Sequence, residues 1–329
     1  MSKPKVGFYW CASCGGCEEA IVDLAEDVLK VVDAVDIVFW PVALDFKRED
    51  VEQMPDGGFT VGFVNGAVRT SEQLEMAELM RRKSQTLIAF GSCSHMGGIP
   101  GLANLHDRSE IFSQVYQMAP SVHNPDATVP QTEHEINGNL LTLPAFWDTV
   151  KSLDQVVPVD YYLPGCPPPV PLIQGALSAI LEGNLPPRGS VLAPDTALCM
   201  TCPRKESKPE LLLLDEFKRP SEIIIDVEKC LLAQGLLCLG PSTRGGCEAA
   251  CISGNMPCTG CLGPTSGVRD FGVKALSAIA SGINSNDPQE ITRRMSQVVD
   301  PAGTFFKYSL PSSLVHRRPI KTVSEETKV

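Results

Sequence analysis

Thirteen cysteines, arranged in two groups, constrain the fold of this 329-residue chain more than any other feature. Five lie between Cys11 and Cys166, each near the end of an apolar run, and eight crowd between Cys199 and Cys261. The first residues, MSKPKVGFYW, contain neither a secretory signal region nor a twin-arginine signal, so we expect a cytoplasmic protein. In a reducing compartment, so many cysteines favour metal ligation over disulfides.

Strand-like and helix-like segments alternate through the first half of the chain. Because strands that alternate with helices form right-handed βαβ units, this order predicts an α/β fold, a flavodoxin-like doubly wound parallel sheet, over residues 1–183. The strand candidates are 5–10, 35–42, 59–68, 86–93 and 159–166, and the helix candidates are 17–34, 70–83 and 171–183. Residues 97–158 show little regular pattern beyond one helix near 110–118.

The second half has a different composition. Residues 183–197 are rich in Pro and Gly without periodicity, which is typical of a domain boundary. The chain is then dense in Cys, Gly and Pro, and helical patterns follow at 268–283 and 287–300. We therefore predict a loop-rich C-terminal domain over residues 184–329 that ends in a polar tail.

Four cysteines of the first half should meet at one edge of the predicted sheet. Cys14 and Cys17 follow the first strand, Cys93 follows the fourth and Cys166 the fifth, each beside Gly or Pro. Because the carboxyl ends of parallel strands share an edge, these thiolates should converge and suit a 4Fe-4S cluster. Buried cysteines acting as small hydrophobes, or a structural zinc, are the alternatives. Cys11 is left over, and we expect a free thiol near the site rather than a redox partner or alternative ligand.

The eight cysteines of the second half are enough for two more clusters. Their order along the chain favours one cluster on the first four and another on the last four, although ligands can interleave, as in two-cluster ferredoxins. Two zinc sites are the alternative. Three tetracysteine sets without a visible substrate site predict an electron-transfer protein. The sets of the second half are Cys199, Cys202, Cys230 and Cys238, then Cys247, Cys251, Cys258 and Cys261.

Other chemistry is sparse in this sequence, and we assign no catalytic residue to it. A formal net charge of -11 argues against nucleic acid or anionic membrane as the main partner. No apolar run is long enough to predict a transmembrane helix, and GGIPG lacks the Lys and Ser or Thr of a phosphate loop. His95, beside Cys93, could tune the cluster or simply belong to the core. Glu18 and Glu19 could carry protons, but acids are ordinary in a first helical turn.

Five segments resemble the small, electron-transferring subunit of nickel–iron hydrogenases. They are CGGCEE, GSCSHMGGIPG, VDYYLPGCPPP, CLGPSTRGGC and MPCTGC, and the resemblance covers about residues 5–263. It is strongest to a cytoplasmic group that includes the methyl-viologen-reducing (heterodisulfide-reductase-linked) and deazaflavin-reducing enzymes of methanogens. This resemblance implies a separate large subunit that holds the nickel–iron centre, and a further redox subunit of flavin/NAD, deazaflavin, ferredoxin or heterodisulfide reductase type.

The resemblance also implies a role for each cysteine set. Cys14, Cys17, Cys93 and Cys166 would hold a proximal 4Fe-4S cluster that faces the nickel–iron site. The set that begins at Cys199 would hold the distal cluster, and the set that begins at Cys247 would hold the medial one. Periplasmic members have His in place of Cys199 and a non-ligand in place of Cys251. Four thiolates at both sites here imply two 4Fe-4S clusters of low potential.

Two further comparisons bear on the resemblance. Many relatives carry Glu where this chain has Asn65, so a proton role at that strand end is not expected here. The main rival is the related iron–sulfur subunit of respiratory complex I, which shares VDYYLPGCPPP. That subunit typically has two adjacent cysteines after its first strand and lacks the eight-cysteine domain. A non-catalytic metal-binding scaffold with zinc in its second half is an alternative of another class.

Overall fold

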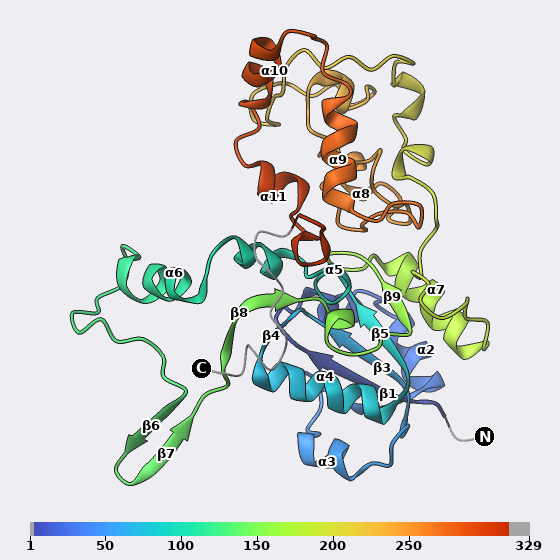
Figure 1. Ribbon diagram of the computed structural model, residues 1–329. Helices are drawn as coiled ribbons and strands as arrows, with labels where there is room; N and C mark the ends of the chain where they lie inside the picture. Colours follow the sequence, from blue (N-terminus) through green and yellow to red (C-terminus); the bar gives the residue numbers. More distant parts are fainter. Residues whose placement is uncertain (1–2, 316–329) are drawn as a thin grey trace.

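A five-stranded parallel sheet forms the centre of the N-terminal half (Figure 1). The computed structural model describes residues 3–315, so the polar tail predicted after that point lies outside the described residues. The strand order β2-β1-β3-β5-β9 is the flavodoxin-like order, and it confirms the predicted α/β fold. The strands are β1 (Lys5–Trp10), β2 (Asp36–Phe39), β3 (Phe59–Asn65), β5 (Ser84–Phe90) and β9 (Tyr161–Leu163).

Helices cover both faces of this sheet. In β5, Ile88 and Phe90 pack with the helices of one face, whereas Leu87 and Ala89 pack with those of the other. This alternation follows from the two-residue period of a strand, and a strand buried on both sides is apolar throughout. The first face is covered by α1 (Gly16–Val22), α2 (Asp27–Ala34) and α7 (Val170–Leu181), the second by α3 (Arg48–Gln53) and α4 (Ser71–Lys83).

The single helix predicted over residues 17–34 is wrong, because the chain forms two helices there. Helix α1 ends at Val22 and α2 begins at Asp27, and between them Ala25 has a φ of 51°. Leu24 nevertheless stays buried in the same core as Ile21. The apolar spacing therefore continues across the break, which is why periodicity alone predicted one helix.

The stretch between residues 97 and 158 contains more structure than the one predicted helix. Helix α6 (Arg108–Ser113) leads into a π-helical turn at Gln114–Met118. A hairpin of β6 (Glu133–Ile136) and β7 (Asn139–Thr142) follows, and Figure 1 shows this arm extending away from the body. Two further strands, β4 (Val68–Thr70) and β8 (Phe146–Lys151), pair antiparallel.

Short helices and turns make up the chain after α7, in the upper part of Figure 1. The helices after α7 are α8 (Ala250–Ser253), α9 (Phe271–Ala280), α10 (Pro288–Met295) and α11 (Pro301–Phe305). The remaining short helix, α5 (Ser92–Met96), belongs to the sheet domain. The 3-10 turns after α7 are Leu198–Met200, Lys205–Ser207, Leu232–Gln234 and Leu310–Ser312. Two others, Ile99–Leu105 and Leu153–Gln155, precede α7.

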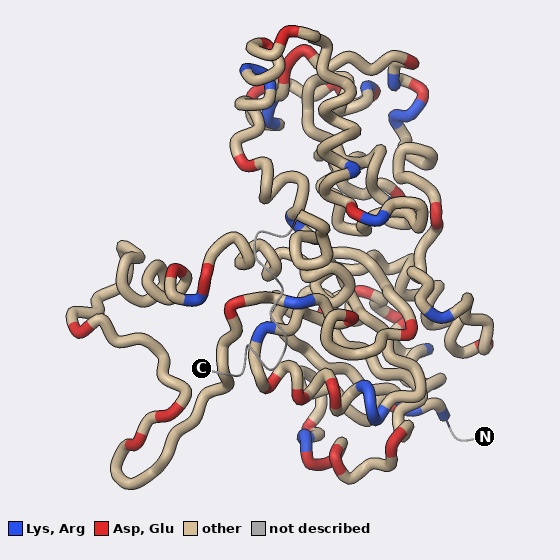
Figure 2. Tube along the Cα trace, viewed as in Figure 1, with Lys and Arg blue, Asp and Glu red and all other residues tan. Residues whose placement is uncertain are grey.

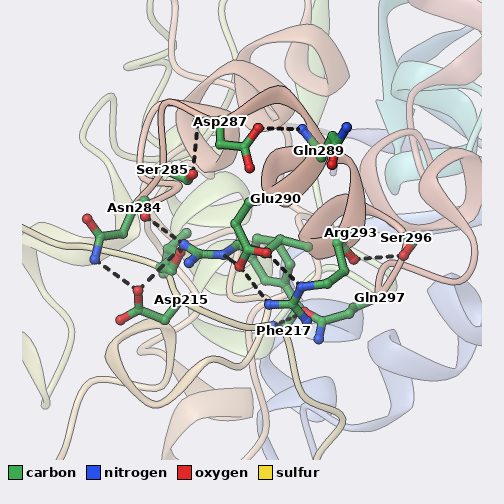
Figure 3. A network of polar contacts seen from close by, with 12 residues as sticks. Asp215, Phe217, Asn284, Ser285, Asp287, Gln289, Glu290, Arg293, Ser296 and Gln297 are labelled. Carbon is green, nitrogen blue, oxygen red and sulfur yellow. Dashed lines mark hydrogen bonds and ion pairs between the residues drawn. The ribbon is translucent and has the colours of Figure 1, made fainter.

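A polar network fastens α10 to the loops of this part (Figure 3). The Arg294 guanidinium pairs with Glu290 at 2.8 Å and donates to the carbonyls of Leu214 and Asn284 at 3.0 and 2.9 Å. One buried cation thus joins α10 to two further segments, which a parallel β-bridge between Leu214 and Ile283 also pairs. The loops of this part depend on such side-chain bonds because few of their backbone groups pair in regular ladders.

The last described residues return to the sheet domain. The backbone N–H of Gly98 donates to the Tyr308 carbonyl at 3.0 Å, and the Gln155 amide donates to the Pro311 carbonyl at 2.9 Å. Pro311 fills the space over Gly101, where an added Cβ would lie 2.4 Å from its ring. Residues 308–311 therefore join the C-terminal part to the loop that follows Cys93.

Charged side chains lie mainly on the outer helices and loops. Figure 2 shows Asp and Glu interspersed with Lys and Arg over both parts of the chain, while the central strands carry few of either. Many of these charges form exposed pairs, such as Arg48 with Glu52 at 2.8 Å, which contribute little to stability. No helix within residues 3–315 has the length and apolar character needed to cross a membrane.

Candidate metal centres

The four cysteines predicted to form the proximal set do come together at the carboxyl edge of the sheet. Cys14 and Cys17 lie in the turn after β1 and the first turn of α1, Cys93 lies in α5 after β5, and Cys166 follows β9. Burial raises the pKa of the Cys17 thiol, and the nearby Cys93, Cys166 and Cys14 raise it further. Each of these thiols is thus within electrostatic reach of Cys17.

Two glycines bring the backbone close to these sulfur atoms. A Cβ added to Gly91 would lie 2.3 Å from Cys17 Sγ, and one added to Gly98 would lie 2.4 Å from Cys93 Sγ. Both glycines also have positive φ, 86° and 58°. Only glycine therefore fits at either position, and the cradle it leaves suits a bulky iron–sulfur cluster with close backbone approach.

The chemistry of this donor set also fits a metal cluster. Burial raises the pKa of Cys93 to about 12, with the charges of Cys166 and Cys14 as further causes, so the thiol is protonated at neutral pH without metal. Iron binding would deprotonate these thiols and satisfy the buried sulfur. Within residues 3–315 no three Cys, His, Asp or Glu side chains could hold one metal ion. A cluster does not need such a group, since each cysteine binds a different iron.

The set that begins at Cys199 lines one small cavity in the C-terminal part. Cys199, Cys202, Cys230 and Cys238 all face it, together with Arg204. Burial raises the pKa of Cys199 to about 12, and the other three cysteines add to that rise. Gly240 again leaves room for sulfur, since an added Cβ would lie 3.3 Å from Cys199 Sγ and 3.6 Å from Cys238 Sγ.

The set that begins at Cys247 gathers around Cys261. Burial raises the pKa of Cys261 to about 12, and Cys247 and Cys251 are among the further causes. Cys258 lies within electrostatic reach of Cys261, and its Sγ is 3.5 Å from Thr243 Oγ1. Cys258 also lies beside Cys238 of the other set, so the division of the eight cysteines into two sets of four stays a prediction.

Contacts at two points connect the three sets in a row. Cys166 lies close enough to the Cys261 thiol to affect its pKa, and the Ser92 hydroxyl, next to Cys93, donates to the Cys261 carbonyl at 2.5 Å; these contacts join the set at the sheet edge to the set around Cys261. The backbone N–H of Cys258 donates to Cys238 Sγ at 3.4 Å, which joins the set around Cys261 to the set that lines the cavity. The set around Cys261 therefore lies between the other two.

Glu18, which the sequence left ambiguous, is a buried carboxylate next to the first set. Asn65 Nδ2 donates to Glu18 Oε1 at 2.9 Å, and Trp40 Nε1 donates to Oε2 at 3.1 Å. Burial raises the pKa of Glu18, while these two hydrogen bonds lower it. The Ser13 hydroxyl donates to Asn65 Oδ1 at 2.8 Å, so the amide connects the end of β3 to the turn that holds Cys14.

Cys11 lies apart from the three sets, whereas His95 shares helix α5 with Cys93. Cys11 packs in the core beneath α4, on the other face of the sheet from Cys17. Burial raises its pKa, and the nearby charge of Glu72 raises it further. The ring of His95 packs 4.7 Å from that of Tyr162, and burial lowers its pKa to about 4, so His95 is neutral at neutral pH.

Comparisons with known proteins place this arrangement in a family. The family described as "NADH ubiquinone oxidoreductase, 20 Kd subunit" matches residues 14–180, which is the sheet domain alone. The iron-sulfur subunit of the F420-non-reducing hydrogenase of Archaeoglobus profundus is 38% identical over 96% of this chain and 99% of its own length. The chain belongs to the hydrogenase small-subunit family.

Another relative agrees with this assignment, and a solved structure shares the fold. The corresponding subunit of the F420-non-reducing hydrogenase of Methanothermobacter thermautotrophicus is 35% identical over 98% of each chain. The [NiFeSe] hydrogenase of Desulfovibrio vulgaris Hildenborough has the same fold, with a TM-score of 0.51 and 17% identity over 80% of this chain and 94% of that one. The Archaeoglobus relative is named as an iron-sulfur subunit. The present chain is the small subunit of a hydrogenase whose catalysis lies in the large subunit.

Substitution of Gly91 by Ala should displace a cluster from this small subunit. The new Cβ would overlap Cys17 Sγ, so we expect loss of about four iron atoms per chain. The control is Gly138→Ala, at a hairpin glycine with a φ of 77° and no atom within 4 Å of an added Cβ. The control carries the strain of a positive φ, roughly 1–2 kcal/mol, without a clash against sulfur, and should keep all its iron. Equal iron content in both variants would contradict the role of Gly91.

Sequence analysis missed two basic residues that the structure brings to the cavity of the Cys199 set. Arg204 and Lys208 both line it. The one available signal was their position, because CPRKESK begins only three residues after Cys199 in an otherwise acidic chain. Solvated basic residues are common in loops, so that signal alone could not distinguish a buried cation from an exposed one.

Proposed function

We propose that this small subunit carries single electrons through three 4Fe-4S clusters, between the nickel–iron site of a large subunit and a further redox subunit. The proximal cluster would be held by the set at the sheet edge, the medial by the set around Cys261 and the distal by the set in the cavity. The observation that carries this proposal is the row of two contacts, Cys166 to Cys261 and Cys258 to Cys238.

The chain's own residues supply binding and insulation in this proposal. Cysteine thiolates would hold the clusters, which supply one-electron redox chemistry when bound. Gly91, Gly98 and Gly240 make room for them, and buried apolar residues such as Leu239 keep water away from the sulfur atoms. We propose residues 1–183 as the domain of the proximal cluster and 184–329 as the domain of the other two.

Complex I membership is less well supported than hydrogenase membership. The complex I family description covers only residues 14–180, where the two classes share their fold, whereas the hydrogenase relatives extend through the eight-cysteine part. Those relatives are named as not reducing F420, which is a deazaflavin. We therefore propose that the electron acceptor is a subunit of heterodisulfide reductase, flavin/NAD or ferredoxin type. We also propose a cytoplasmic location, consistent with thirteen free thiols.

Anaerobic purification of the tagged chain from its own cells tests the function. We expect a larger subunit that contains nickel to co-elute, and dihydrogen-dependent reduction of a viologen dye by the complex but not by the separated chain. Recovery of the chain with iron and sulfide but without any nickel-containing partner would contradict the hydrogenase role and favour a complex I-like subunit.

A further inference from the structure

Arg204 is a buried cation without a carboxylate partner in the described part of the chain. The residue is only 7% exposed, and no Asp or Glu oxygen within residues 3–315 forms an ion pair with it. Its nitrogen atoms donate instead to neutral oxygens, including the Ile252 carbonyl at 3.0 Å and Asn255 Oδ1 at 2.8 Å. Burial of an unpaired charge is costly, so such a cation indicates a nearby anion.

Acidic side chains near Arg204 do not supply that anion. Asp226 is the carboxylate whose pKa the Arg204 charge helps to lower, but the larger causes are its bonds to the Glu228 backbone and to Lys229. Asp226 is exposed and lies 3.2 Å from Lys229. Arg204 also donates weakly to the Asp226 carbonyl at 3.4 Å, which is a backbone contact rather than an ion pair.

Arg204 instead lies in the wall of the cavity that the four thiols of the Cys199 set line. Arg204 and Lys208 line the same cavity as Cys199, Cys202, Cys230 and Cys238. Lys208 is exposed at the cavity mouth, and its charge opposes the rise in the pKa of Cys199. A 4Fe-4S cluster with four thiolates carries net negative charge that increases on reduction.

We propose that Arg204 and Lys208 form a cationic site that stabilises the reduced distal cluster and so raises its midpoint potential. This inference rests on the proposed cluster assignment. The geometry gives the two residues different strengths. Arg204 is buried within the cavity wall, where its charge is poorly screened, whereas Lys208 is exposed and acts through solvent.

Charge variants of the purified complex test this proposal. We expect Arg204→Gln to lower the ratio of reduced to oxidised distal cluster, at a fixed solution potential, by about tenfold, which is 59 mV for one electron. Arg204→Lys keeps the charge and should restore most of that ratio. Lys208→Gln should give a smaller shift in the same direction that disappears at high salt. The measurement is a redox titration followed by electron paramagnetic resonance.

Lys205→Gln is the matched control, because Lys205 is exposed, lies 3.6 Å from Glu206 and does not line the cavity. It should leave the potential unchanged. The distal signal is assigned by its loss in Cys230→Ala. An unshifted potential in Lys208→Gln at low salt, with full iron and sulfide, would overturn the proposal even if Arg204→Gln lost its cluster. A wild-type complex with no iron bound to the Cys199 set would overturn the proposed function itself.

Discussion

Removal of iron and sulfide will unfold residues 184–315 while the parallel sheet remains folded. The longest helix of this part, α9, has only ten residues, and helices that short are marginal without tertiary packing. The hydrophobic core of residues 184–315 includes Cys238 and Cys258, with Cys202, Cys230 and Cys247 packed against it. Because the thiols hold the loops together only through bound metal, the free energy of cluster binding is free energy of folding.

Limited proteolysis and near-ultraviolet circular dichroism will measure this unfolding. We expect rapid cleavage after about residue 184 in the apo chain and a protected fragment that contains the sheet. Cys14→Ala is the control, because it removes one exposed ligand of the proximal set and leaves the other two sets intact. This variant should keep residues 184–315 protected. An apo chain that retains its near-ultraviolet signal and its resistance throughout would contradict this account.

Substitution of Cys258 by Ala will almost abolish electron transfer through the subunit. Cys258 belongs to the central set and also donates its backbone N–H to Cys238 Sγ. Loss of the medial cluster would remove the middle step, so electrons could not pass from the proximal to the distal cluster. We expect dihydrogen-dependent reduction of the redox subunit to fall to near zero, while hydrogen–deuterium exchange, which needs only the large subunit, continues.

Cys11→Ala is the matched control for this variant. Cys11 is as buried as Cys258, but it lies in the core beneath α4 and outside the three sets. Its loss should cost some stability through a small cavity and leave both iron content and electron transfer unchanged. The relay would be contradicted if Cys258→Ala kept its transfer rate, or if Cys11→Ala lost iron.

Much of the site could be predicted because it depends on the order of strands. Cys14, Cys93 and Cys166 each follow a strand of a parallel sheet, and topology alone brings the ends of such strands to one edge. The division of the eight later cysteines into two sets of four is a prediction that rests on their compactness along the chain. Both inferences use connectivity, which the sequence records directly, and neither needs the conformation of a side chain.

Other features depend on local conformation or on tertiary contacts. The break at Ala25 leaves no mark in the apolar period, and nothing in its neighbours requires a positive φ. The hairpin of β6 and β7 did have a signal, since Asn137 and Gly138 both adopt positive φ and Asn-Gly favours such turns. The burial of Arg204 depends on the loops around Asn255, far along the chain, so no local pattern could reveal it.

Iron and acid-labile sulfide per chain, measured on the anaerobically purified complex, test the central claim most directly. Three 4Fe-4S clusters on this subunit predict about twelve of each, after correction for any other iron in the complex. A value near four would mean that only one of the three sets binds a cluster. Zinc without sulfide would mean that the cysteines are structural, and it would contradict the electron relay.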